Sequence, residues 1–226
     1  MKPWLIVPAK PFTAAKSRLA ASFSPAERAQ LGAYLLDRTL RVAQKAGAFA
    51  EIIVVSRDPA ARQLASALGA RALAEAGNEL NLAVTQACRE AQECGAASVL
   101  VLPADLPLLT VADLHQLCAA ADTPATAVIT PSRDGGTNAL LLPLPAPITF
   151  AYGIDSFTHH VRQAVRSALS VRVVETDSLR FDLDAPADLS ELASDRPVAL
   201  QELLANLAPS RGSGGDNPLY ALPHGA

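Results

Sequence analysis

The chain has little net charge and few cysteines, and each of these features limits the functions that it can have. Its 226 residues include 19 basic and 22 acidic side chains, which gives a formal net charge of −3. Nucleic acids and anionic membranes attract proteins through an excess of positive charge, so this balance argues against both as partners. The three cysteines, Cys88, Cys94 and Cys118, show no C-x-x-C spacing. An odd number without such spacing is typical of reduced thiols in the cytosol.

Long apolar runs and the common ligand-binding signatures are also missing. The apolar run in MKPWLIVPAK is too short for a signal peptide, and no stretch approaches the length of a membrane span. We therefore expect a soluble cytoplasmic protein. The loop after this run has no G-x-G-x-x-G and no G-K-[ST], which excludes a dinucleotide fingerprint and a P-loop. The absence of G-x-S-x-G leaves serine hydrolase chemistry without support.

Short apolar runs that alternate with helical patterns predict the fold. Such alternation indicates an α/β domain with a mostly parallel sheet and helices on both faces. Ser24, Pro25 and Glu27 form a predicted capping box at the start of one helix, and Gly47 ends it. The apolar runs predict strands at 4–7, 51–56, 70–74, 98–103, 126–131, 138–143, 171–176 and 180–184. The runs at 126–131 and 138–143 lie so close together that an antiparallel insertion is expected there.

The composition changes near residue 194. We expect one domain over residues 1–194 and a C-terminal extension over residues 195–226. RPVALQELLANLA in this extension predicts one short helix. The Gly-, Pro- and Ser-rich remainder predicts disorder, because it has few apolar residues to pack.

Ligands of an open parallel sheet bind beyond the carboxyl ends of its strands, so the residues after each strand are candidates. Lys10, Lys16 and Arg18 follow the first strand and would suit a polyphosphate, although a solvated basic loop has the same composition. Asp105 follows a buried strand between prolines. That position suits a Mg²⁺ ligand, and a helix-entry turn is the alternative.

Two more carboxylates, Asp182 and Asp184, lie in the predicted strand RFDLD. Residues i and i+2 of a strand share a face, so like charges here would need a cation or a proton between them. A solvated strand end remains the alternative. His159 and His160 are adjacent on a predicted helix and cannot share a face, and no acidic ligand pattern surrounds them. Neither is predicted to be catalytic.

The stretch PSRDGGTNALLLP places two glycines, a hydroxyl and an amide directly before an apolar run. Glycines allow close approach of the backbone, and Thr and Asn offer donors. The stretch is therefore either a hairpin turn or a ligand cradle.

Five motifs in this order resemble one enzyme family: PAK…AKSRL, LPADLPLL, PSRDGGTNALLL, YGIDSFTHH and DLDAPADL. The chain is similar, over residues 3–192, to the guanylyltransferases of deazaflavin coenzyme F-420 biosynthesis. These enzymes act on 2-phospho-L-lactate, phosphoenolpyruvate or 3-phosphoglycerate. The resemblance implies a single-domain, nucleotide-diphospho-sugar transferase-like nucleotidyltransferase fold, with GTP as substrate and Mg²⁺ as cofactor.

The resemblance also implies site residues. Lys16 and Asp105 are implied as catalytic residues, and Lys10, Lys16 and Asn81 as contacts of the nucleotide. Glu79 stands where such loops commonly have glycine. The remaining implied positions bind metal (Asp105, Asp182 and Asp184) or the phosphorylated acid (Gly136, Thr137, Gly153 and Ser156).

The implied reaction joins GMP from GTP to a small phosphorylated acid and releases pyrophosphate. Phosphoenolpyruvate is favoured over 2-phospho-L-lactate and 3-phospho-D-glycerate as the acceptor. The alternatives are a molybdopterin or sugar-phosphate nucleotidyltransferase and a non-catalytic nucleotide-binding regulator. The sequence leaves a homodimer open.

Overall fold

The computed structural model describes residues 1–207, and its centre is a seven-stranded sheet with the strand order β3-β2-β1-β4-β6-β5-β7. The strands are β1 Trp4–Pro8, β2 Ile52–Ser56, β3 Arg71–Ala74, β4 Ser98–Val101, β5 Thr126–Pro131, β6 Thr137–Pro143 and β7 Ser170–Val173. β6 pairs antiparallel with both β4 and β5, and all the other pairs are parallel. The predicted parallel sheet with an antiparallel insertion is therefore confirmed.

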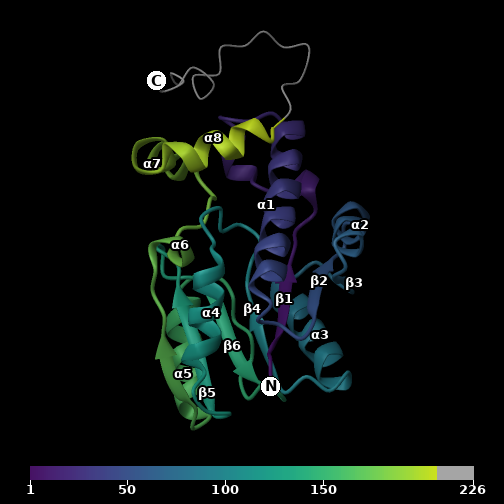
Figure 1. The fold of residues 1–226 in the computed structure, drawn as a ribbon, viewed down its shortest axis with the longest axis vertical. Helices are drawn as coiled ribbons and strands as arrows, with labels where there is room; N and C mark the ends of the chain where they lie inside the picture. Colours follow the sequence, from purple (N-terminus) through teal and green to yellow (C-terminus); the bar gives the residue numbers. More distant parts are fainter. Residues whose placement is uncertain (208–226) are drawn as a thin grey trace.

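Helices cover both faces of this sheet, as predicted (Figure 1). The side chains at the centre of β1 are fully buried, because successive residues of a strand point to opposite covered faces. On one face, α1 Pro25–Ala46, α2 Pro59–Ala67 and α4 Val111–Ala120 pack against the strands. On the other, α3 Leu80–Glu93 and α5 Ser156–Arg166 do so.

The first long helix begins and ends where its sequence predicts. Ser24 accepts a hydrogen bond from the Glu27 amide, and the Glu27 carboxylate accepts one from the Ser24 amide. This capping box satisfies two amides that have no partner within the helix. Gly47 takes φ 59° at the other end, a left-handed conformation that glycine adopts without steric cost.

A third apolar cluster joins the start of α1 to two helices near the end of the described chain. These are α7 Pro186–Asp195 and α8 Pro197–Ala205. Leu31 of α1, Leu189 of α7 and Leu200 of α8 are buried together. The helix predicted for the extension is therefore present as α8, and it packs on the body. The boundary at residue 194 stays a prediction, and the disordered segment predicted after this helix lies almost wholly outside the described residues.

The strand predicted at 180–184 is wrong. The chain leaves the sheet after β7 and forms a short helix, α6 Asp177–Arg180, because the Thr176 side chain caps it by accepting from the Leu179 amide. Residues 181–184 continue without a strand partner. Phe181 and Leu183 are nevertheless buried, whereas Asp182 and Asp184 are only half-buried. The predicted alternation of faces therefore holds in a segment that is not part of the sheet.

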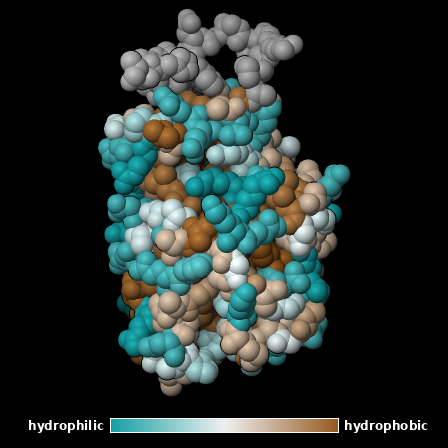
Figure 2. Space-filling view, in the orientation of Figure 1, coloured by the Kyte–Doolittle hydropathy of each residue, from teal (hydrophilic) through white to brown (hydrophobic). Residues whose placement is uncertain are grey.

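The remaining short elements are η1 Phe12–Ala14 and η2 Ser17–Leu19, in the loop between β1 and α1. On the side of the molecule viewed in Figure 2, hydrophobic side chains are scattered among hydrophilic ones. Among residues 1–207, no helix has the length and apolarity needed to cross a membrane.

Candidate active site

A cavity of about 370 Å³ lies at the edge of the sheet where β1 and β4 end. Open α/β sheets bind ligands at this edge. Because β6 runs antiparallel to β4, its first residues reach the same edge. Nine of the ten site residues that the family resemblance implies line this cavity, and they come from five segments of the chain: Lys10, Lys16, Asp105, Gly136, Thr137, Gly153, Ser156, Asp182 and Asp184. Their individual roles stay predictions.

The cationic loop between β1 and α1 forms one wall. Lys16 has φ 54° and ψ 37°, a left-handed conformation that costs a non-glycine residue about 1–3 kcal/mol. Its side chain is only 7% exposed, and Nζ lies 3.0 Å from Oδ2 of Asp105. The Phe12 amide donates to Asp58 Oδ2 at 2.7 Å, which fastens the loop to the start of α2. The fold therefore stabilises a strained backbone that points a buried ammonium group at the Asp105 carboxylate.

Carboxylates crowd the centre of the cavity. Burial raises the pKa of Asp182 to about 6, and the negative charge of Asp105 adds to this effect. The two segments are held side by side, because the Leu183 amide donates to the Asp105 carbonyl at 3.0 Å. A cation placed between these carboxylates would relieve their repulsion.

The three carboxylates predicted to bind metal do not converge on one point. Within the described part of the chain, no group of three or more His, Cys, Asp or Glu side chains is placed to hold a metal ion. Each of two carboxylates has a basic partner instead: Asp105 pairs with Lys16, and Asp184 pairs with Arg18 at 3.0 Å. Spacing along the chain could not show these ion pairs, and metal binding by the three carboxylates stays a prediction.

The stretch that precedes β6 is both a hairpin connection and a wall of the cavity. Gly135 takes φ 85°, a conformation that favours glycine, and a Cβ on Gly136 would lie 2.7 Å from Ser132 Oγ, so a side chain there would displace that hydroxyl. The Asp134 carboxylate accepts hydrogen bonds from Ser132 Oγ and from the Gly136 amide. The bond from Ser132 lowers the pKa of Asp134. The two readings of this stretch are therefore compatible.

Thr137, the first residue of β6, meets the start of α5. Its Oγ1 lies 3.1 Å from Ser156 Oγ and 3.0 Å from His160 Nδ1. The Phe157 amide donates to the Gly135 carbonyl at 3.3 Å, which ties the first turn of α5 to the hairpin connection. Buried hydroxyls next to the amino-terminal end of a helix offer donors to an anion.

Asn81 is the predicted residue that does not line the cavity. Its Nδ2 donates to the Tyr152 carbonyl at 3.3 Å, and its Oδ1 accepts from the Tyr152 amide at 2.7 Å. The amide group thus holds the turn that carries Gly153, and a direct nucleoside contact stays a prediction. Asn78 lines the cavity three residues earlier.

Several other residues that line the cavity were not among the predicted site residues. Arg57 follows β2 and Glu75 follows β3 at the same edge of the sheet. Position after a strand could have identified both. Asn138 Nδ2 donates to the carbonyls of Leu179 and Arg180, at 3.0 and 3.3 Å, and so holds the segment that leads to Asp182. No local pattern indicates such a contact.

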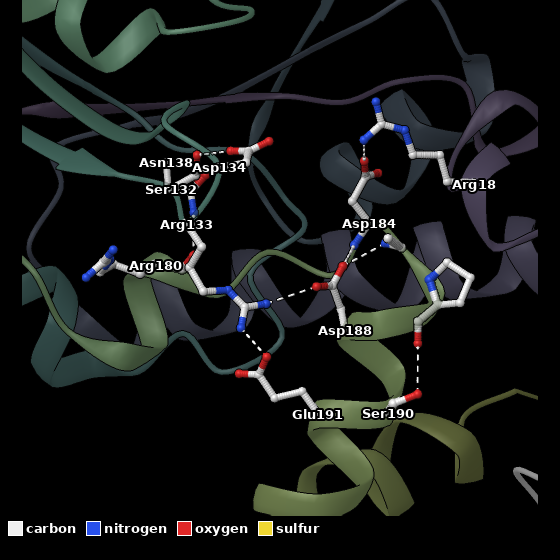
Figure 3. A network of polar contacts seen from close by, with 12 residues as sticks. Arg18, Ser132, Arg133, Asp134, Asn138, Arg180, Asp184, Asp188, Ser190 and Glu191 are labelled. Atoms are coloured by element: carbon white, nitrogen blue, oxygen red, sulfur yellow. Dashed lines mark hydrogen bonds and ion pairs between the residues drawn. The ribbon is translucent and has the colours of Figure 1, made fainter.

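A polar network at the border of the cavity fixes the hairpin connection to the carboxylate segment (Figure 3). Arg133 pairs with Asp188 at 2.9 Å and also with Glu191, and its guanidinium group lies 4.3 Å from the centre of the Phe181 ring. The Asp188 carboxylate also accepts from the Asp184 amide at 2.8 Å. One arginine therefore links the segment before β6 to the segment that carries Asp182 and Asp184.

The fold is that of nucleotidyltransferases of known structure. The chain superimposes on a nucleotidyl transferase from Methanothermobacter thermautotrophicus with a TM-score of 0.64 at 17% identity, over 89% of this chain and 99% of that one. It also superimposes on a 4-diphosphocytidyl-2C-methyl-D-erythritol synthase from Anaerococcus prevotii, with a TM-score of 0.58 at 13% identity, over 83% of this chain and 92% of that one. At these identities the likeness shows the fold alone.

The sequence comparisons identify the family. Residues 3–196 match the family model described as guanylyl transferase CofC like. The chain is 42% identical to a phosphoenolpyruvate guanylyltransferase of Rubrobacter xylanophilus, over 88% of this chain and 97% of that protein. It is 34% identical to a 2-phospho-L-lactate guanylyltransferase of Methanothermobacter thermautotrophicus, over 94% of this chain and 96% of that protein. The chain belongs to the CofC-like guanylyl transferase family, as its motifs predicted.

Proposed function

We propose that this nucleotidyltransferase transfers GMP from GTP to the phosphate of phosphoenolpyruvate, with release of pyrophosphate, in deazaflavin coenzyme F-420 biosynthesis. One observation carries the proposal: a single cavity has cationic and carboxylate groups on one side and buried hydroxyl donors on the other. A nucleoside triphosphate suits the first side and a small anionic acid suits the second. The similarity to the Rubrobacter relative favours phosphoenolpyruvate as that acid.

In this reaction a phosphate oxygen of the acid attacks the α-phosphorus of GTP. A new P–O bond forms, the bond between the α-phosphorus and the β-phosphate oxygen breaks, and pyrophosphate leaves with the electron pair. The attacking oxygen is already an anion near neutral pH, so no side chain has to remove a proton. The protein must instead bring two anions together in line and neutralise their charge.

Lys16 is the side chain best placed for this neutralisation, because the protein buries it and points it into the cavity. Lys10 lines the same wall and would contact the outer phosphates. Both ammonium groups would stabilise the charge that develops on the departing pyrophosphate.

The cavity fits Mg²⁺, although the side chains form no complete cage for it. Mg²⁺ sites typically use one or two carboxylates plus phosphates of the substrate. Asp105 and Asp182 would supply these carboxylates, because burial and mutual repulsion raise the pKa of Asp182 in the absence of a cation. When bound, Mg²⁺ would screen the triphosphate charge and polarise the α-phosphate. The predicted role of Asp184 as a ligand requires that it exchange its contact with Arg18.

Thr137, Ser156 and the turn at Gly153 would bind the acid. Thr137 and Ser156 are 7% and 1% exposed, and a hydrogen bond from such a buried hydroxyl to an anion meets little competition from water. Gly153 has φ 142°, a conformation open to glycine but not to other residues, so its backbone can face the cavity without a side chain.

Pyrophosphate release tests this proposal. The enzyme would be supplied with GTP, Mg²⁺ and, in separate reactions, phosphoenolpyruvate, 2-phospho-L-lactate, 3-phospho-D-glycerate and a sugar 1-phosphate. We expect release with phosphoenolpyruvate and a product whose mass equals the acid joined to GMP. Preference for 2-phospho-L-lactate would correct the acceptor. Turnover with the sugar phosphate and with none of the three acids would refute the proposal, as would binding of GTP without release of pyrophosphate. Reactions with ATP or CTP in place of GTP are the nucleotide controls.

A further inference from the structure

His160 lies one turn after Ser156 on α5, and its side chain is fully buried. It does not line the cavity, so it cannot touch a ligand there. Both ring nitrogens have partners: Nδ1 lies 3.0 Å from Thr137 Oγ1, and Nε2 lies 3.0 Å from the Ala151 amide nitrogen. The Tyr152 ring packs edge-on against the imidazole at 5.0 Å between ring centres.

These contacts determine which nitrogen carries the proton. A backbone amide can only donate a hydrogen bond, so Nε2 of His160 must accept from Ala151 and has no proton. A neutral imidazole then carries its proton on Nδ1 and donates it to Thr137 Oγ1. Burial, with a smaller contribution from the neighbouring His159, lowers the pKa of His160 to about 4. The ring is therefore neutral at physiological pH.

The position of this proton decides what Thr137 and Ser156 can offer to the cavity. The two hydroxyls have two hydrogens between them. One hydrogen forms the bond between the two hydroxyls. Because His160 donates to Thr137 and takes no hydrogen from it, the second hydrogen is free to bond to a ligand. If Nδ1 were instead an acceptor, it would take the hydrogen of Thr137. Ser156 would then donate to Thr137, and the pair would present only lone pairs to the cavity.

We propose that His160 is a positioning residue that orients the Thr137 and Ser156 hydroxyls as donors and thereby makes the acid subsite selective for an anion. His160 acts without contact with the substrate. It also fastens the turn that carries Gly153, through Ala151. The inference rests on the proposed function in one respect, namely that the ligand next to these hydroxyls is the phosphate or carboxylate of the acid.

Two substitutions separate the two bonds of His160. In His160→Asn, the amide nitrogen can replace Nδ1 and donate to Thr137, while the Ala151 amide loses its acceptor. In His160→Gln, the longer side chain can reach the place of Nε2 and accept from Ala151, while Thr137 loses its donor. We expect KM for the acid to rise at least tenfold in His160→Gln and less than threefold in His160→Asn. KM for GTP should change less than twofold in both.

His159→Gln is the matched control, because it changes the adjacent, exposed histidine and should leave both KM values unchanged. A residue that only supports the fold would affect both substrates alike. Equal rises in KM for acid and GTP, or a larger rise for the acid in His160→Asn than in His160→Gln, would overturn the inference.

The protonation of the wild-type ring gives a test that does not depend on activity. Long-range ¹H–¹⁵N correlation spectra at pH 7, with His160→Gln used to identify the signals, should show a proton on Nδ1 and none on Nε2 of His160. A proton on Nε2 would overturn the inference. Absence of pyrophosphate release by the wild-type enzyme with every acid would instead refute the proposed function and leave the spectroscopic result to decide the role of His160.

Discussion

Replacing Thr137 with valine tests how the cavity is divided between acid and nucleotide. Valine keeps the shape of threonine and removes Oγ1, which has two partners in the protein. The Nδ1 proton of His160 would be left buried without an acceptor, at a cost of about 1–3 kcal/mol. At roughly 2–4 °C per kcal/mol for a chain of this size, the melting temperature should fall by about 2–12 °C.

The same change removes a donor to the acid. A hydrogen bond to a charged group contributes about 1.5–3 kcal/mol, so kcat/KM for the acid should fall roughly ten- to a hundredfold. KM for GTP should remain within a factor of two. Combination with Ser156→Ala should cost less than the sum of the single changes, because both hydroxyls would bind one group.

The assay is a pair of saturation curves, one in the acid and one in GTP, measured well below the melting temperature. Thr137→Ser is the matched control, since it keeps the hydroxyl and should retain most of the activity and stability. If Thr137→Val weakens the binding of GTP and leaves that of the acid unchanged, the hairpin connection binds the nucleotide. The assignment of the two sides of the cavity to acid and nucleotide would then be wrong.

Three further changes test other parts of the site. Asp105→Asn should reduce kcat on the order of a hundredfold or more at saturating Mg²⁺ with little change in circular dichroism, because a neutral amide cannot balance the metal charge; near-normal turnover would remove Asp105 as a ligand. The pKa of His160 is lowered from 6.5 to about 4, so its stabilising contribution is present above pH 6.5 and is lost as the pH falls towards 4. In urea titrations, the free energy of unfolding should fall between pH 7 and pH 4.5 by up to about 3 kcal/mol more in wild type than in His160→Gln. Equal falls in the two proteins would argue against this pKa shift. Arg133→Met removes the ion pairs with α7 and the contact with Phe181, so it should lower the free energy of unfolding by about 1–2 kcal/mol in urea titrations, whereas an unchanged midpoint would show that the network is not stabilising.

Much of the fold and site could be predicted because the signals are local. A buried strand is an apolar run, and a parallel sheet brings the residues that follow its strands to one edge. Lys16 and Asp105 were predicted by that reasoning together with the family motifs, and the structure places their charged groups 3.0 Å apart. The glycines before β6 were also identifiable, since glycine allows the left-handed backbone of Gly135 and a close approach of the chain at Gly136.

The features that the sequence could not predict depend on distant residues. RFDLD has the alternation of a strand, yet the cap by Thr176 starts a helix before it, and its amides find partners such as the Asp105 carbonyl. The carboxylates of Asp105 and Asp184 form ion pairs with Lys16 and Arg18, which lie far from them in the sequence. Asn81 stays a predicted nucleoside contact, and its observed partner is the backbone of a residue 71 positions later. No local pattern contains these contacts.

The direction of β6 explains how the two sides of the cavity come together. Lys16 and Asp105 follow strands that end at the edge of the cavity, whereas Thr137 begins its strand there. β6 spans seven residues, or roughly 23 Å at about 3.3 Å per residue. In a parallel orientation its first residue would lie that far away, at the opposite edge of the sheet. The antiparallel insertion between β4 and β5 therefore brings the hydroxyl donors beside the cationic loop, and an acid bound to them could reach the α-phosphate in line.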